Sequence, residues 1–280
     1  MTTAAPAAPL TALPPVSPVV KFGRLLASEW IKLRTMRSTI WSLIVLVVVS
    51  IGLTALFAVL VTKTWTGAHN GSRNASIVAD PVSNLLGTGI NLGQLAICVL
   101  GVLFITAEYS SSVIKLSLLV TPRRLPMLAA KATVLAAVIV VVGEIVSFGA
   151  FLAGSAILHD RVRVSLGDPG VARAVVGTGL ALGVLSLFAL SIGVIIRHTA
   201  GAITTVIGVV LVLPIITGQL PGSWGTHINA YLPEQAGGLM AQAHRHSGDL
   251  LTAWQGFGIF CLWTAALLVL ASFLLSRRDA

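Results

Sequence analysis

Charged residues are scarce in this chain of 280 residues. Lysine, arginine, aspartate and glutamate make up 10% of the sequence, whereas hydrophobic residues make up 56%. A soluble domain carries about 25% charged residues. The few charges gather in short clusters between long uncharged tracts, which excludes a water-soluble fold, because such a fold places polar residues along every element. The pattern is typical of an integral membrane protein.

Cysteines are rare, and the signatures of common enzymes are missing. Cys98 and Cys261, the two cysteines, both lie inside apolar runs, so neither a disulfide framework nor a structural zinc site is expected. The sequence has no Gly-x-Ser-x-Gly, His-Glu-x-x-His or Walker-type phosphate-binding motif. We therefore expect no catalytic residues, no metal and no cofactor in this chain, and no ATP hydrolysis by the chain alone.

Acidic residues are half as numerous as basic ones, nine against eighteen, which gives a formal net charge of +9. Nucleic acid is not an expected partner, because the basic residues flank the apolar runs and are explained by membrane topology. With both chain ends in the cytoplasm, twelve basic residues lie inside and six outside. This bias agrees with the positive-inside rule and predicts cytoplasmic termini.

Six apolar stretches are long enough to cross a bilayer, for which about twenty residues are needed. They cover residues 40–61, 85–107, 132–158, 171–196, 200–220 and 251–275. Only Arg197, His198 and Thr199 separate the fourth stretch from the fifth. We expect two helices and a tight turn there, because a single helix would be far too long for one crossing. The predicted fold is an all-α membrane bundle of six spanning helices, which occupies residues 40–280.

The sequence also predicts the structure of three segments outside the spans. Residues 1–20 are rich in proline and alanine and are expected to form a disordered tail. Residues 221–250, between the last two spans, are expected to form one or two short helices that dip back into the outer leaflet. Residues 21–39 are predicted to form a basic amphipathic helix at the inner membrane surface. Its apolar stripe consists of Phe22, Leu25, Leu26, Trp30, Leu33 and Met36.

One carboxylate, Glu144, lies well inside a predicted span. A charge at mid-bilayer costs at least about 2.5 kcal/mol on insertion scales, so this side chain should face the interior of the bundle. It could contact a substrate or a proton as an intramembrane polar site, or it could form a hydrogen bond between helices. The sequence is compatible with both.

The segment between the second and third spans, residues 108–131, is the most informative. It begins with Glu108 and Tyr109 and can form a short helix over residues 110–119 that ends before Pro122. Arg123, Arg124 and Lys131 then lead into the third span. Such a rigid, charged projection on the cytoplasmic side is suited to docking into another protein.

This segment resembles that of the permease subunits of type-2 ABC exporters, in particular the compact actinobacterial kind. Three further runs are similar in the same order, namely SEWIKLRTMRSTIW, RHTAGAITTVIGVVLVLP and YLPEQAG. The resemblance implies a bacterial plasma-membrane protein that pairs with a second permease subunit and with a separate ATPase, which binds ATP and Mg²⁺. It also implies that the coupling residues are Glu108, Tyr109, Ser112, Ile114, Lys115, Arg123 and Arg124.

Two other functions fit the same topology. A membrane anchor or sensory protein would bind partners without translocating anything. An ion-coupled secondary transporter is favoured by Glu144, but the internal repeat typical of such proteins is not evident between the two halves of the sequence.

Overall fold

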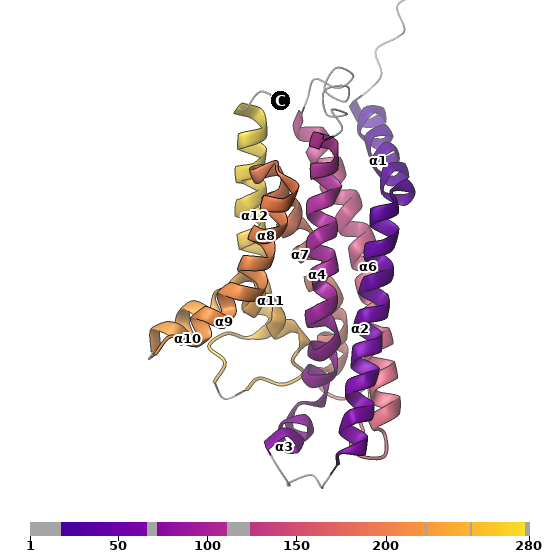
Figure 1. Ribbon diagram of the computed structural model, residues 1–280, viewed down its shortest axis with the longest axis vertical. Helices are drawn as coiled ribbons and strands as arrows, with labels where there is room; N and C mark the ends of the chain where they lie inside the picture. Colours follow the sequence, from indigo (N-terminus) through magenta and orange to yellow (C-terminus); the bar gives the residue numbers. More distant parts are fainter. Residues whose placement is uncertain (1–17, 66–71, 111–123, 222, 247, 278–280) are drawn as a thin grey trace, which may run out of the picture.

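The computed structural model describes residues 18–65, 72–110, 124–221, 223–246 and 248–277. Every regular element in these ranges is a helix, and the long helices run side by side to form an elongated bundle (Figure 1). Six helical segments are long and apolar enough to cross a membrane. The all-α membrane bundle predicted from the sequence is thus confirmed.

The spanning helices are α2, α4, α6, α7 and α12, together with a fifth span built from three consecutive helical pieces. Their bounds are Arg37–Lys63 (α2), Pro81–Ser110 (α4), Arg124–Leu158 (α6), Val171–Ile196 (α7), Thr199–Ile207 (α8), the π-helix Gly208–Val212 (η1), Leu213–Gly218 (α9) and Ala253–Arg277 (α12). The remaining helices are Pro18–Thr35 (α1), Ser72–Ala79 (α3), Ser223–Ala230 (α10), Pro233–Gly238 (α11) and the 3₁₀ turn Leu239–Ala241 (η2).

Three of the observed spans, α2, α4 and α6, extend beyond the predicted ones, whereas the fifth and sixth are displaced from them by one or two residues at each end. The fourth span is α7 with the predicted bounds, whereas α6 begins at Arg124 instead of residue 132. Because the prediction began this span after a charged residue, it cut the helix short at Lys131, a lysine that the structure buries almost completely. The segment that links α4 to α6 therefore shortens to residues 111–123, which lie outside the described residues.

Helix α1 begins at Pro18, so the last three residues of the expected tail are helical. Met36 interrupts the helix with an extended backbone (φ −73°, ψ 121°), and α2 starts immediately afterwards at Arg37. Figure 1 shows α1 at the end of the bundle where α4 ends and α6 begins, with α3 at the opposite end. We call these two ends the α1 end and the α3 end.

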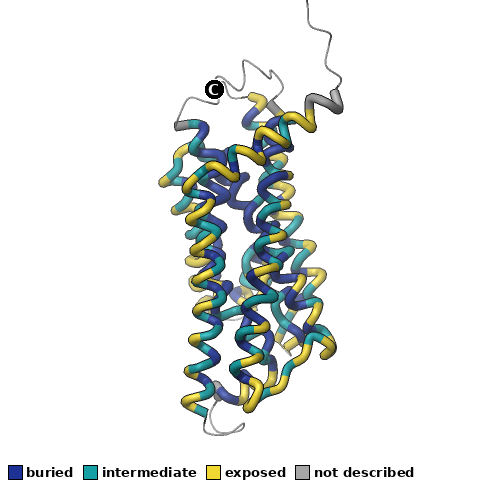
Figure 2. The backbone as a smooth tube through the Cα atoms, turned by 90° about the vertical axis from the view of Figure 1, so that its right-hand side faces the viewer, coloured by how far each residue is buried: buried dark blue, intermediate teal, exposed yellow. Residues whose placement is uncertain are grey.

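Small residues allow the central helices to pack closely, as is common in membrane bundles. Gly143 of α6 lies against Gly179 of α7, and Ser147 donates a hydrogen bond of 2.6 Å to the carbonyl of Val175. Helix α7 is the most buried span, whereas α2, α12 and the fifth span carry many exposed apolar side chains, as contact with lipid requires. Figure 2 shows this division between a buried interior and exposed outward faces.

The turn between the fourth and fifth spans has the predicted form. Arg197 adopts a left-handed conformation (φ 59°) and its backbone N–H donates to the carbonyl of Gly193, which ends α7. His198 then caps α8, since its Nδ1 accepts a hydrogen bond of 3.2 Å from the backbone N–H of Gly201. A left-handed residue followed by a capping residue reverses the chain within a few residues.

Residues 221–250 contain the expected short helices, α10 and α11, followed by η2. Figure 1 shows α10 projecting sideways and α11 lying close to α12. Side chains from the spans hold this segment by its backbone. Arg173 of α7 donates to the carbonyls of Gln242 at 2.8 Å and Ala243 at 3.0 Å, and the indole of Trp263 donates to that of Tyr231 at 3.1 Å.

Candidate functional site

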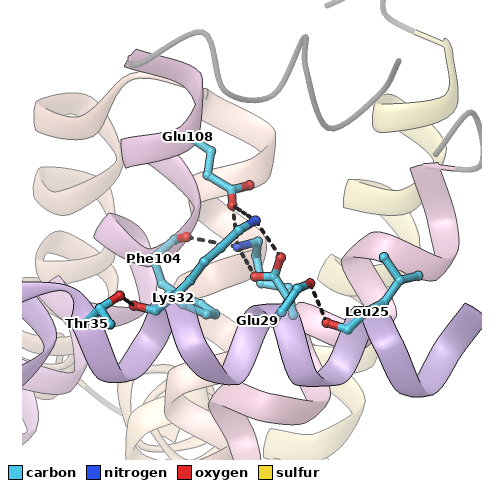
Figure 3. Close-up of polar contacts among 8 residues, drawn as sticks. Leu25, Glu29, Lys32, Thr35, Phe104 and Glu108 are labelled. Carbon is cyan, nitrogen blue, oxygen red and sulfur yellow. Dashed lines mark hydrogen bonds and ion pairs between the residues drawn. The ribbon is translucent and has the colours of Figure 1, made fainter. Parts of the chain in front are cut away.

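Four charged side chains from three helices meet at the α1 end of the bundle. Glu29 and Lys32 come from α1, Glu108 from the last turns of α4, and Lys131 from α6. Figure 3 shows Glu29 and Lys32 on α1 turned toward Glu108. We call these four residues the charge cluster.

Lys131 is the centre of the charge cluster. Its Nζ donates to Oε2 of Glu29 at 2.6 Å and to Oε1 of Glu108 at 3.0 Å. The same ammonium group lies 3.4 Å from the carbonyl oxygen of Phe104 and 4.2 Å from the centroid of its ring. Lys32 closes the ring of contacts, at 2.8 Å from Glu29 and 2.9 Å from Glu108.

The charge cluster is buried and has no formal net charge. The side chains of Lys131 and Glu29 are 1% and 2% exposed, that of Glu108 is 10% exposed, and that of Lys32 is 35% exposed. Removal of such groups from water costs several kcal/mol for each ion, as an order of magnitude, unless partners compensate it. Here Glu29 and Glu108 are each paired with both lysines, and these ion pairs offset the cost of burial. Because the four residues come from three helices, the offset requires all three helices to be in place.

The pKa values on α1 follow from this pairing. Burial favours the neutral form of Glu29, but the charge and hydrogen bond of Lys131, together with those of Lys32, outweigh burial and lower the pKa of Glu29. Burial likewise opposes the charge on Lys32, but its bonds to Glu29 and Glu108 prevail and raise the pKa of Lys32. Both groups are therefore charged when α1 is docked near neutral pH.

The sequence places these groups by helical spacing. Leu26, Glu29 and Leu33 recur at intervals of three and four, so they share the face of α1 that points into the bundle. Phe22 and Trp30, which belong to the predicted apolar stripe, are exposed. The inward face thus combines apolar contacts with one acidic side chain that reaches the buried lysine of α6.

Tyr109 also turns toward the bundle. The guanidinium of Arg197, at the turn between α7 and α8, lies 5.5 Å from the centroid of the Tyr109 ring, within the range of a cation–π contact. The end of α4 is therefore tied to α1 and α6 through Glu108 and to the fourth and fifth spans through Tyr109.

The predicted coupling residues divide into two groups. Glu108 and Tyr109 are described, and their side chains make the contacts within the chain given above, so Glu108 in particular acts by holding α1 against α4 and α6. Arg124 begins α6. Ser112, Ile114, Lys115 and Arg123 lie outside the described residues, as does the side chain of Arg124.

Glu29 and Lys131 were not predicted as site residues. The signal was present in weak form, since Glu29 is an acid within an otherwise basic helix and stands three residues before a lysine. Lys131 stands just before a predicted span, where a basic residue indicates membrane topology. Their pairing joins residues 102 positions apart, which spacing along the sequence does not indicate.

Glu144 lies at the contact between α6 and α7. Its carboxyl group packs against Gly179, whose lack of a side chain makes room for it, and its Oε2 has no hydrogen-bond partner among the described residues. The two alternatives given by the sequence, contact with a substrate or proton and a hydrogen bond between helices, both stay predictions. Among the described residues, no group of three histidine, cysteine or acidic side chains is placed to hold a metal ion.

Comparison with known proteins adds no relative: no protein-family model matches the chain, and none of the curated proteins matches it. The likeness to type-2 ABC permeases therefore remains a hypothesis from the sequence motifs, and the function has to be argued from topology and geometry.

Proposed function

We propose that the chain is the membrane-spanning half of an ATP-driven exporter in the bacterial plasma membrane. It pairs with a second permease subunit and with a separate ATPase, and its α1 end faces the cytoplasm. Three features support this function, namely the six spans, the excess of basic residues on one side of them, and the four sequence runs that resemble type-2 permeases.

The charge cluster is the observation that carries the proposal. It fixes α1 to the end of α4 and to the beginning of α6, the two helices that flank residues 111–123. A partner that pushes on this segment or on α1 is therefore expected to displace helices that run through the membrane, because ion-pair networks and rigid helices can carry coupling between distant sites. An anchor without a transport function would not need the spans to be linked in this way.

Co-purification tests the docking part of the proposal. The full chain is co-expressed with the product of a neighbouring gene that encodes a Walker-motif ATPase, and the complex is isolated through a tag on the ATPase. We expect the double variant Lys115→Glu, Arg123→Glu to abolish co-purification while membrane insertion is unchanged. Lys63→Glu is the matched control, because Lys63 is an exposed lysine at the α3 end.

Unchanged co-purification of the double variant would contradict the docking assignment. ATP-dependent flux in proteoliposomes then separates the three candidate functions. An anchor binds the ATPase without flux, and a secondary transporter shows flux that follows an ion gradient and needs no ATPase. Cysteine labelling of residues 108–131 only from outside the cell would refute the proposed orientation.

A further inference from the structure

A cavity of about 650 Å³ lies away from the charge cluster, between α4, α7, the fifth span and the α10–α11 segment. Its size falls within the range of small-molecule sites, about 300–1,000 Å³. Much of the wall is apolar, with Leu86 and Ile90 from α4, Leu182 and Leu185 from α7, and Phe260 from α12. Such walls can accept the hydrocarbon part of a ligand.

Glu234 is an acidic residue of the cavity wall that is held by a hydrogen bond from another helix. This half-buried residue of α11 lines the cavity, and its Oε1 accepts a hydrogen bond of 2.8 Å from Nε2 of Gln94 on α4. Gln94 is itself buried, with 7% of its surface exposed. Asn91 and Thr178 line the same space. A carboxylate held in place by a buried amide is a fixed element of the site.

The charges around the cavity have one sign. Among the described residues that line it, Glu234 and Asp249 are acidic, and none is lysine, arginine or histidine. Asp249 is engaged locally, because its Oδ2 accepts a hydrogen bond of 2.8 Å from the backbone N–H of His246 and lies 3.7 Å from the ring of that histidine. Glu234 takes part in none of the ion pairs between described residues.

We propose that this cavity binds an amphiphilic organic cation, with the carboxylate of Glu234 facing the positive charge and the apolar walls holding the hydrocarbon body. Partial burial opposes the charge on Glu234, and a ligand cation supplies a counter-ion. An anion of equal size would face two carboxylates, and no basic side chain among the described residues that line the cavity. The assignment of this ligand as the exported substrate rests on the function proposed above, whereas the binding site does not.

Two ions of the same shape and opposite charge test the charge preference. Tetraphenylphosphonium and tetraphenylborate have four phenyl rings around one central atom and differ in sign. Their affinity for the purified full-length chain is measured by equilibrium dialysis in detergent, without an ATPase. We expect tetraphenylphosphonium to bind and tetraphenylborate to bind at least about tenfold more weakly, the ratio that one charge-assisted contact provides.

Glu234→Gln tests the role of the carboxylate, since it keeps the shape and the hydrogen bond to Gln94 but removes the charge. It should weaken tetraphenylphosphonium binding about tenfold or more. Asp160→Asn is the matched control, because Asp160 lies on an outer turn with 90% of its side chain exposed and should leave the affinity unchanged. Equal binding of the two ions, no binding of tetraphenylphosphonium, or unchanged affinity in the Glu234→Gln variant would each overturn the proposal.

A second measurement uses the unaltered protein, in case the Glu234→Gln variant does not fold. A hydrophobic carbodiimide modifies buried carboxyl groups, and mass spectrometry locates the modified residue. Tetraphenylphosphonium should protect Glu234, and tetraphenylborate should not; equal modification with and without the cation would refute the site. Failure of these experiments leaves co-purification with an ATPase unaffected, and loss of co-purification leaves cation binding unaffected, so the two proposals can fail separately.

Discussion

Lys131 is the position where a single substitution tests the structure most directly. Lys131→Met keeps the length of the aliphatic chain but removes the ammonium group that lies 2.6 Å from Glu29 and 3.0 Å from Glu108. The two carboxylates then share Lys32 alone, whose side chain is 35% exposed. The variant therefore leaves buried negative charge without adequate compensation.

The expected loss is large because the pairs are buried. Removal of one partner of a buried ion pair destabilises a protein by about 3–5 kcal/mol, much of it from the charge left behind. The neutral quadruple variant Glu29→Gln, Lys32→Met, Glu108→Gln, Lys131→Met leaves none of the four charges unpaired. It should recover most of the lost stability, because exchange of a whole buried ion network for neutral side chains is often close to neutral in free energy.

Reversible unfolding in mixed micelles measures the free energy of unfolding, and hydrogen exchange of the α1 amides reports whether that helix is released. Lys63→Met is the control, because Lys63 is exposed and lies at the α3 end. Surface substitutions of this kind stay within about 0.5 kcal/mol of the wild type. If Lys131→Met also stays within that range and α1 keeps its protection, the charge cluster does not hold α1.

Three further outcomes are expected. The pKa of Glu29 lies below its ordinary value of 4.5, so its ion pairs stabilise the docked α1 fully above pH 4.5. This stabilisation is lost as the pH falls through the lowered pKa, and hydrogen exchange of the α1 amides at acidic pH measures the loss. Gly89→Ala should destabilise the fold by about 1–3 kcal/mol in the unfolding assay, since the new methyl group meets the backbone of Ser50. Gly52→Ala, with no atom in its way, should cost nothing. Glu144→Gln should retain assembly and ATP-dependent flux, because Glu144 is not among the described residues that line the cavity; loss of flux in an assembled protein would assign its carboxylate to transport.

The spanning helices could be predicted from the sequence because length and apolar composition decide them locally. The stretch 171–196 is α7 to the residue, and the turn at Arg197 was expected for the simple reason that one bilayer cannot contain both helices. The start of α6 could not be predicted in this way. A lysine is normally excluded from the interior of a span, and only two carboxylates from other helices make Lys131 acceptable there.

The charge cluster and the cavity depend on contacts between distant parts of the chain. The periodicity of α1 predicted an amphipathic helix, but it could not show that Glu29 faces the bundle, because the partner that draws it inward is on α6. Glu234 was visible as part of the run YLPEQAG without any chemical role. Its role becomes apparent once α11 is seen beside α4, where Gln94 meets a residue 140 positions away.

Helix α4 connects the two sites. Glu108 belongs to the charge cluster and Gln94 to the cavity, and the two residues are fourteen positions apart along α4, which corresponds to about 21 Å of helix. A displacement of α1 and α6 at one end therefore reaches the partner of Glu234 through a single continuous element. Since Gln94 fixes the carboxylate, a shift of α4 along its axis changes the distance between Gln94 and Glu234, and with it the affinity of the cavity for a cation. In an ATP-driven exporter, α4 would let the ATPase at the α1 end change the affinity of the cavity at Glu234. Alternating capture and release of a substrate require such a change in affinity.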